Sequence, residues 1–477
     1  MSKGFSQILI YTRPLEVHFH LALAAELAKA FPSARLRFAT FFSWAARRVE
    51  AKGFSVVYLP TQLAKVTGAE VSDARFREID EELYKETGAN INLMLQSERF
   101  LPTEPGMAEL FCRKHLAVLD SMVTPGTLSV SSMFDHYVYW LAGSLANARG
   151  GAHFAFTPCG VPANRTIALR TPWQTWRVPV TEDPEAVLRD SIAALSLPAS
   201  KRINYMREPA RESLAVRAQR RRMSFEMYRS YCRDTQAGSY FRNAATSPLH
   251  YFLVDLPWRR LQRLLPSGEI AHHEINSTKD LDSIGGRFCY LPLHLEPEAS
   301  TLMWSPWLRD QYEACRLVCG ALPAGWRLLV KENPKMLGLR SPGFYEKVRA
   351  LPHTLLVNPA LESTELILRC DVTAALAGTA LLEASLLGRP AICLGRPSFR
   401  ALCSASDIAA SLPLSELSSI IGQARPALTM ELWADWLAGT VRASSCPERS
   451  NGYHGIDSSK SNVETFISYM LAAIREA

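Results

Sequence analysis

Short apolar runs alternate with amphipathic segments through the first half of the chain. The run Gln7–Tyr11 is typical of a buried strand, and a polar turn separates it from an apolar-periodic, helix-like segment near 18–30. Further strand-like runs lie near 36–40, 56–59 and 153–157, and helix-like segments lie near 73–87, 106–121 and 134–148. Because strands and helices alternate, the pattern predicts a parallel sheet with helices on its faces.

The same alternation returns after an arginine-rich, helix-like and nearly glycine-free stretch at about 198–240. Strand-like runs lie near 251–256, 288–293, 326–331, 354–358, 371–375 and 391–394, and helix-like segments lie near 258–265, 306–320, 343–350, 363–369 and 379–387. This second series predicts a second doubly wound domain. Two more helix-like segments, separated by polar and turn-rich residues at 443–460, predict a helical tail.

The chain length supports two domains. Its 477 residues exceed the roughly 250–300 at which one hydrophobic core stops growing. We predict a first Rossmann-like domain over 1–245, which includes the arginine-rich connection, and a second over 246–430. A helical tail over 431–477 is expected to pack back across the assembly. The predicted class is therefore α/β, with two doubly wound parallel-sheet domains facing a cleft.

Composition places the chain among ordinary folded proteins, since 48% of its residues are hydrophobic and 21% are charged. Charged residues and histidines interrupt the N-terminal apolar stretches, so we expect no secretory signal. No apolar run reaches the length of about 18 residues that a spanning helix needs. The ten cysteines are scattered, mostly in apolar segments, which fits a reducing cytosol, and no zinc-ligand set is evident. We therefore predict a cytoplasmic protein without a metal site.

The formal net charge of +7 is concentrated in one place. Ten Lys or Arg stand against three Glu between residues 201 and 233. This segment is either a solvated helix face or a surface for anionic lipid head groups, a phosphorylated acceptor or nucleic acid. No nucleic-acid-binding motif accompanies the charge, so we expect no nucleic-acid partner. Peripheral contact with an anionic membrane, at the inner face of the plasma membrane, stays open as an alternative.

A stiff polar loop follows the first strong strand-like run of the second series. Ligands of open parallel sheets bind at the carboxyl ends of the strands, which is where this loop begins. Two prolines between residues 291 and 301 restrict its backbone, and His294 and Glu298 are candidates to contact a phosphate and a ribose. The alternative is structural, with Glu296 or Glu298 capping the next helix.

Two further strand ends carry groups suited to phosphate. Lys331 supplies a point charge, although an ordinary surface lysine would look the same. Gly378 permits close backbone approach, and Thr379 starts a helix whose first N–H groups favour an anion. Glu383, one turn into that helix, can reach ribose hydroxyls. Arg396 follows the last strand-like run, where the glycines indicate a helix C-cap and a turn.

These loops and their flanks form an ordered set of motifs. The set consists of 290–301 (YLPLHLEPEAST), Asp310-Gln311, Leu322-Pro323, 329–334 (LVKENP), Phe344-Tyr345 and 377–384 (AGTALLEA). It resembles the capsular polysaccharide biosynthesis and related surface-carbohydrate proteins, which look like GT-B glycosyltransferases and include bacterial sugar-acid transferases with CMP-activated donors. The resemblance covers about residues 287–396, and the first 250 residues match only in their strand and helix style.

The resemblance implies a metal-independent GT-B glycosyltransferase. Such an enzyme moves a sugar from a CMP- or UDP-linked donor to a growing capsular or surface polysaccharide or to its lipid-linked acceptor, and it needs no further cofactor. The implied donor-site residues lie in the second domain: His294, Glu298, Lys331, Asn333, Gly378, Thr379 and Glu383. Asn333 departs from the family pattern, which has His in a Lys-Glu-His-Pro motif. Asparagine keeps hydrogen bonding but loses the ability to carry charge or transfer a proton.

The resemblance also implies that the acceptor and the catalytic side chains belong to the first domain. The candidates follow its first strand-like run: Glu16, His18 and His20, with Arg13 beside them. Glu16 or one of the histidines is a candidate general base toward an acceptor hydroxyl. A second candidate cluster is Asp135 with His136. Helix capping and surface hydration are the structural alternatives for both clusters.

Two other functions fit the same sequence. The first is a nucleotide-sugar epimerase or hydrolase of the same architecture, which would need no acceptor. The second is a non-catalytic polysaccharide-assembly protein, which Asn333 and the basic segment 201–233 would suit.

Overall fold

The computed structural model describes most of the chain. The described residues are 4–14, 16–98, 106–132, 134, 136–162, 165–197, 273–296, 298–406, 414–443 and 458–476. They divide into two compact units, the first made of 4–179 and 438–476 and the second of 180–197 and 273–437. The basic segment 201–233, the expected boundary at 245/246, the segments 251–256 and 258–265, and Asp135 lie outside the described residues.

The first unit is built on a mainly parallel sheet. Its strands lie in the order β13-β6-β5-β4-β1-β2-β3, and β7 pairs with β6. The parallel strands are β1 (Gln7–Tyr11), β2 (Arg35–Thr40), β3 (Ser55–Tyr58), β4 (Thr127–Ser131) and β5 (Ala152–Pro158). The antiparallel strands are β6 (Thr166–Thr171), β7 (Gln174–Thr175) and β13 (Thr440–Val441). The order reverses between β1 and β4, which makes this edge a topological switch point.

Helices cover both faces of this sheet, and the central strands β1 and β4 are buried along their whole length. On one face, Ile8 and Ile10 of β1 pack into a core with α1 (Val17–Ala30), α2 (Ser43–Glu50) and α21 (Lys460–Glu476). On the other face lies α7 (Tyr137–Ala148), against which three more helices pack: α4 (Asp73–Thr87), α5 (Ile91–Gln96) and α6 (Met107–Met122). The short α3 (Leu59–Lys65) contacts β3 and α6.

The second unit contains a wholly parallel sheet among its described residues. The order is β10 (Thr354–Val357), β9 (Trp326–Lys331), β8 (Arg287–Pro292), β11 (Val372–Ala375) and β12 (Ala391–Cys393). One face carries α15 (Gln311–Gly320), α16 (Phe344–Arg349) and α19 (Leu414–Gln423), and the other carries α17 (Ser363–Arg369) and α18 (Thr379–Leu386). The remaining elements are α8 (Pro184–Leu195), α13 (Thr278–Ile284), α14 (Ala299–Leu302), η2 (Pro334–Met336), η3 (Arg400–Leu402) and α20 (Met430–Leu437).

The predicted α/β class with two Rossmann-like sheets is confirmed. The apolar runs of β1, β8, β9, β11 and β12 became strands at the expected places, since each is short, buried and bounded by polar turns. The division of the chain is less simple than the expected sequence of two domains and a tail. Residues 180–197 belong to the second unit, and 438–476 belong to the first. Among the described residues, no helix is long and apolar enough to cross a membrane.

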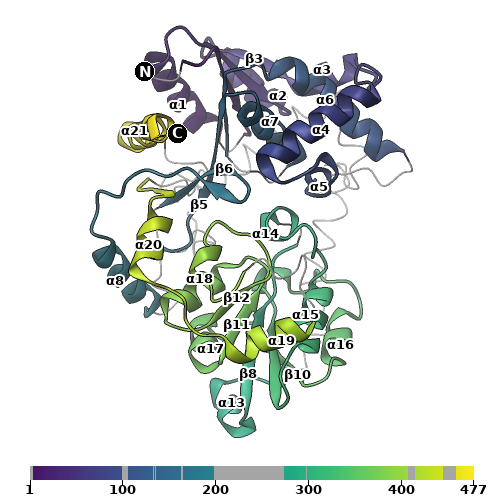
Figure 1. Ribbon diagram of the computed structural model, residues 1–477, viewed down its shortest axis with the longest axis vertical. Coiled ribbons are helices and arrows are strands. Elements are labelled where there is room, and N and C mark those ends of the chain that lie inside the picture. The colour runs from purple at the N-terminus through teal and green to yellow at the C-terminus, as the bar shows by residue number, and fades with distance from the viewer. Residues whose placement is uncertain are drawn as a thin grey trace, which may run out of the picture. The chain divides into compact units, whose positions relative to one another are not determined.

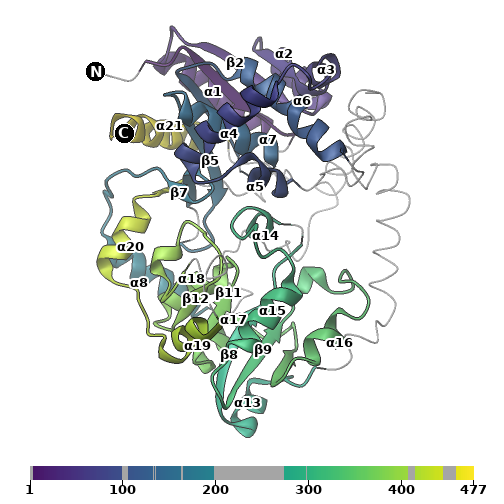
Figure 2. The ribbon, with the colours of Figure 1, turned by 45° about the vertical axis from the view of Figure 1, so that its right-hand side comes forward.

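The C-terminal helix α21 completes the core of the first unit. It lies beside α1 in both views (Figures 1 and 2). Phe466 is fully buried between Phe19 of α1 and Phe156 of β5, with ring centroids 5.0 and 4.8 Å away. The Tyr469 hydroxyl donates to the backbone carbonyl of Trp176 at 2.9 Å. The end of the chain therefore stabilises the sheet that its beginning forms.

We expect Phe466→Ala to lower the free energy of unfolding of the first unit by about 3–5 kcal/mol, because it removes a buried aromatic ring and leaves a cavity. Urea unfolding followed by tryptophan fluorescence measures this loss. Ser468→Ala on the exposed face of the same helix is the matched control, for which roughly 0.5 kcal/mol or less is expected. Equal stability of the two variants would contradict the packing of α21.

Candidate functional site

A histidine and a glycine meet at the switch point of the second unit. Here β8 and β11 are neighbours, but the chain leaves β8 toward α15 on one face and leaves β11 toward α18 on the other. His294 lies just beyond β8, and Gly378 lies just beyond β11. A Cβ atom at Gly378 would stand 2.8 Å from the Cε1 atom of His294. The imidazole therefore lies against a backbone that has room for no side chain.

The surroundings of His294 fix both its position and its charge. The backbone N–H of His294 donates to the Gln311 side-chain oxygen at 3.0 Å, and its backbone carbonyl accepts from Arg340 Nη2 at 2.7 Å. Ala377 N–H approaches the ring's Nε2 at 3.5 Å, which favours the tautomer with the proton on Nδ1. Burial, with a contribution from the Arg340 charge, lowers the pKa of His294 to about 4. The ring is therefore neutral at pH 7.

The helix that starts at this glycine presents its positive end. Gly378 is the N-cap of α18 in an extended conformation, and as a glycine it has no side chain with which to cap this N-terminus. The first N–H groups of the helix and its dipole favour a negatively charged group here. Thr379 is the first helical residue, and Glu383 follows one turn later, half-buried. Gly378 lies against the His294 ring, and Thr379 follows it as the first residue of α18.

Lys331 is engaged inside the unit, so it is not an ordinary surface lysine. It ends β9 and is only 8% exposed, and its Nζ donates to Ser363 Oγ at 3.1 Å. The same oxygen accepts from the Tyr290 hydroxyl at 3.1 Å. Burial lowers the pKa of Lys331, while the carboxylates of Glu362 and Glu383 act in the opposite direction. Lys331 and Glu383 therefore belong to one electrostatic cluster on the face that α17 and α18 cover.

Glu298 and Asn333 have local backbone roles in the structure. The carbonyl of Glu298 accepts from Thr301 N–H and Leu302 N–H at 3.1 and 2.9 Å, so this residue begins α14 as the structural alternative expected. Asn333 N–H donates to the Glu332 carboxylate at 2.6 Å, and its carbonyl accepts from Met336 N–H at 2.8 Å at the start of η2.

A buried ion-pair network around Arg340 supports the loop that carries His294, and Arg340 was not among the predicted site residues. Arg340 is 3% exposed at its side chain and donates to both oxygens of Glu332, at 2.7 and 3.0 Å. It also pairs with Glu296, whose pKa burial raises. The Tyr345 hydroxyl donates to Glu332 at 2.9 Å. The network thus joins the loops after β8 and β9 to α16.

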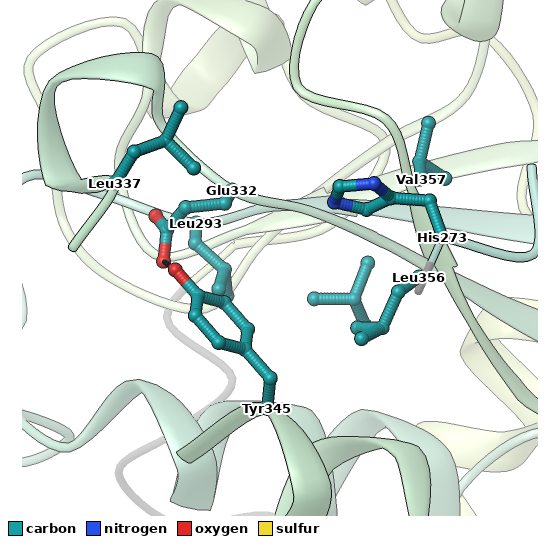
Figure 3. Close-up of a pocket in the computed structure, with 8 residues that line it drawn as sticks. His273, Leu293, Glu332, Leu337, Tyr345, Leu356 and Val357 are labelled. Carbon is teal, nitrogen blue, oxygen red and sulfur yellow. Dashed lines mark hydrogen bonds between the residues drawn. The ribbon is translucent and has the colours of Figure 1, made fainter. Parts of the chain in front are cut away.

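A small cavity lies beside this network. Figure 3 shows the Tyr345 hydroxyl directed at the Glu332 carboxylate, with His273 across an apolar floor formed by Leu356 and Val357. Its volume of ≈ 10 Å³ is roughly the space of one water molecule. The cavity therefore does not accommodate a nucleotide.

The loop after β12 closes against the two loops that carry His294 and Gly378. Gly395 N–H donates to the Leu376 carbonyl at 2.8 Å, and Arg396 N–H donates to the Trp304 carbonyl at 2.7 Å. A Cβ at Gly395 would lie 2.6 Å from both carbonyl oxygens. The Arg396 guanidinium lies over the Trp307 ring, 5.1 Å from its centroid. Three strand-end loops of the second unit therefore meet at one place.

The first unit gathers polar groups at its own switch point, between β1 and β4. Arg13 Nε donates to Glu16 Oε1 at 2.9 Å, and Arg13 Nη2 donates to Ser132 Oγ at 3.2 Å, which joins the two loops. Burial raises the pKa of Glu16, but the charge and hydrogen bonds of Arg13 outweigh this effect and leave the pKa below its ordinary value. Glu16 is therefore ionised at neutral pH.

The two predicted histidines of α1 have different surroundings. His20 is fully buried, its Nδ1 lies 3.0 Å from Thr12 Oγ1, and burial lowers its pKa to about 4. His18 is exposed, and partial burial together with the charges of Arg48 and Lys52 lowers its pKa. The structure thus brings His20 near Glu16, one helical turn away, and places His18 on another side of the helix.

His136, from the second candidate cluster of this unit, has a buried carboxylate partner. His136 Nδ1 lies 3.3 Å from Glu98 Oε1, and Tyr137 N–H donates to Glu98 Oε2 at 3.1 Å. Sequence reasoning missed Glu98, which is 38 residues away. Within the described residues, no group of three or more His, Cys, Asp or Glu is arranged to hold a metal ion.

Comparison with known proteins gives distant structural similarities. No family model matches the chain, and no curated protein matches its sequence. Similar solved structures include KpsC from Thermosulfurimonas dismutans, a beta Kdo 2,7 transferase, with 12% identity, a TM-score of 0.30, and coverage of 75% of this chain and 89% of that chain. A putative UDP-N-acetylglucosamine 2-epimerase from Listeria monocytogenes has 13% identity, a TM-score of 0.23, and coverage of 91% and 94%. Such values assign neither a family nor an activity to this chain.

We expect the His294 ring to titrate near pH 4, because its ordinary pKa of 6.5 is lowered by burial. The stability that depends on the neutral ring is then complete above pH 6.5 and falls as the pH drops toward 4. Selective ¹³C labelling of histidine followed by NMR measures the titration, with His294→Asn to assign the signal. A His294 resonance that titrates between pH 6 and 7 would show that the ring is solvated.

Proposed function

We propose that the chain is a GT-B-type glycosyltransferase that binds the phosphate of a nucleotide-sugar donor at the switch point of the second unit. The observation that carries this proposal is the approach of the His294 ring to Gly378 at the uncapped N-terminus of α18. A bare backbone at a helix start lets a phosphate oxygen come close to several N–H groups. The neutral ring with its proton on Nδ1 adds a hydrogen-bond donor without a competing charge.

The other predicted donor-site residues contribute either through their charges or through the loops that they shape. In this proposal Glu383, one turn into α18, accepts hydrogen bonds from ribose hydroxyls of the nucleotide. The buried cation of Lys331 offsets the negative charge of Glu383 and Glu362, so the region tolerates an anionic ligand. Glu298 and Asn333 shape the loops after β8 and β9. The leaving nucleotide is then stabilised by the helix N-terminus and by fixed donors.

The acceptor belongs to the first unit in this proposal. Glu16, Arg13 and Ser132 offer an ionised carboxylate, a guanidinium and a hydroxyl at one switch point, and such groups recognise a saccharide or a phosphorylated, lipid-linked acceptor. The ordered motifs over 287–396 support an acceptor in capsular or surface polysaccharide synthesis. Among the candidate catalytic residues, Glu16 and His20 lie in this region, and His18 faces elsewhere.

The direct test is nucleotide release from CMP-, UDP- and GDP-sugars in the presence of oligosaccharide or lipid-linked acceptors. We expect release to depend on the acceptor. Gly378→Ala should weaken donor binding at least tenfold, because the added Cβ forces the His294 ring to move. Glu383→Gln should weaken it by roughly 10- to 100-fold, the usual effect of losing a charged hydrogen bond.

Glu365→Gln on the neighbouring helix α17 is the matched control, since this glutamate is exposed. Its donor affinity, measured by calorimetry, should equal that of the wild type. Release without any acceptor would favour an epimerase or hydrolase. Absence of nucleotide binding would favour a non-catalytic assembly protein, and full activity in Gly378→Ala and Glu383→Gln would reject the site.

Chelation provides an independent prediction. Because the helix N-terminus and fixed donors stabilise the leaving phosphate in this proposal, turnover should be unchanged in EDTA. Initial rates before and after dialysis against EDTA measure this. A loss of activity that magnesium or manganese restores would contradict metal-independent transfer.

A further inference from the structure

A histidine–carboxylate pair stands at the switch point of the first unit. His136 is the N-cap of α7, just after β4, and its Nδ1 lies 3.3 Å from Glu98 Oε1. The Glu98 side chain is 1% exposed, whereas that of His136 is 23% exposed. One partner is therefore buried and the other is partly exposed, which is the arrangement of a proton-transfer group with an orienting carboxylate behind it.

Two hydrogen bonds hold the Glu98 carboxylate in place. One oxygen faces the His136 ring, and the other accepts from Tyr137 N–H at the start of α7 at 3.1 Å. The Glu98 oxygen that faces Nδ1 suits a neutral ring with its proton on Nδ1 and its lone pair on Nε2. A lone pair on Nε2 is what a general base needs.

The pair borders the polar groups already described. The Tyr139 ring meets His136 edge-on, with centroids 5.6 Å apart, and Arg13 lies over the same ring at 5.8 Å. Arg13 in turn holds Glu16 and Ser132. His136 thus belongs to the cluster in which we placed the acceptor.

The other candidate bases of this cluster are less suitable. Glu16 is ion-paired with Arg13, which makes its carboxylate a weaker proton acceptor. His20 is fully buried, so an acceptor hydroxyl does not reach it. His136 combines partial exposure with a fixed tautomer, and neither of the other two residues has both.

We propose that His136, positioned by Glu98, is the general base of the reaction. This inference rests on the glycosyl transfer proposed above. Nε2 takes the proton from the acceptor hydroxyl, and the acceptor oxygen bonds to the anomeric carbon of the donor sugar. The bond from that carbon to the phosphate oxygen breaks, and the phosphate keeps the electron pair. Glu98 is a positioning residue that acts through the histidine.

His136→Ala should lower kcat by about 10²- to 10⁴-fold, which is the usual contribution of a general base, with little change in the KM for the donor. Added imidazole should restore part of the turnover in this variant, because a free ring can enter the space and take the proton. Glu98→Gln should lower kcat less, by roughly tenfold, since the ring keeps its place but loses the negative partner. His353→Asn, an exposed histidine with a φ of 54° that asparagine tolerates, is the control.

A purely structural role of His136 as the N-cap of α7 predicts a different result. If His136→Ala fails to fold, His136→Asn provides the test, because asparagine caps helices well but cannot act as the base. Full turnover in His136→Asn, or a loss in His136→Ala that imidazole leaves unchanged, would overturn the inference while leaving glycosyl transfer intact. Absence of acceptor-dependent transfer in the wild type would instead overturn the proposed function, and this inference with it.

Discussion

An imidazole ring that lies against a bare glycine backbone holds the site of the second unit together. The His294 ring occupies the space that a side chain at Gly378 would need, so the loops after β8 and β11 are brought close without a covalent or ionic link. Parallel strands make this approach possible, because they end at one edge while the helices that follow lie on opposite faces. The N-terminus of α18 is thereby presented beside a neutral hydrogen-bond donor.

A buried ion-pair network around Arg340 supports the loop that carries His294. Arg340 is bound by Glu332 and Glu296 and donates to the carbonyl of His294, so the loop after β8 is fixed by a network whose polar groups are satisfied. Such a network orients its neighbours more than it stabilises the fold, since desolvation offsets much of the attraction between the charges. An arginine bridges two strand-end loops in the first unit as well, where Arg13 joins Glu16 to Ser132. In each unit an arginine side chain thus joins two strand-end loops.

Local patterns in the sequence predicted strands well, but they missed contacts between distant loops. β8 and β9 were predicted because each is a short apolar run that ends in polar residues. β4 was missed because its Thr-Leu-Ser-Val-Ser pattern is half polar, and its serines are buried against His153. The predicted strand ends identified His294 and Gly378 as candidates. The two residues meet because the loops after neighbouring parallel strands lie at the same edge of the sheet. Glu98 was missed because His136 lies 38 residues away in the sequence, and Arg340 was missed because one of its partners, Glu296, lies 44 residues away.

Hydrogen–deuterium exchange of the full chain, with and without UDP or CMP, tests most directly whether the edge at β8 and β11 binds a nucleotide phosphate. The account predicts slower exchange at the amides of 377–381 and around His294 when a nucleotide is bound, because the phosphate shields the first N–H groups of α18. Protection confined to other parts of the chain, with unchanged exchange at these amides, would contradict it.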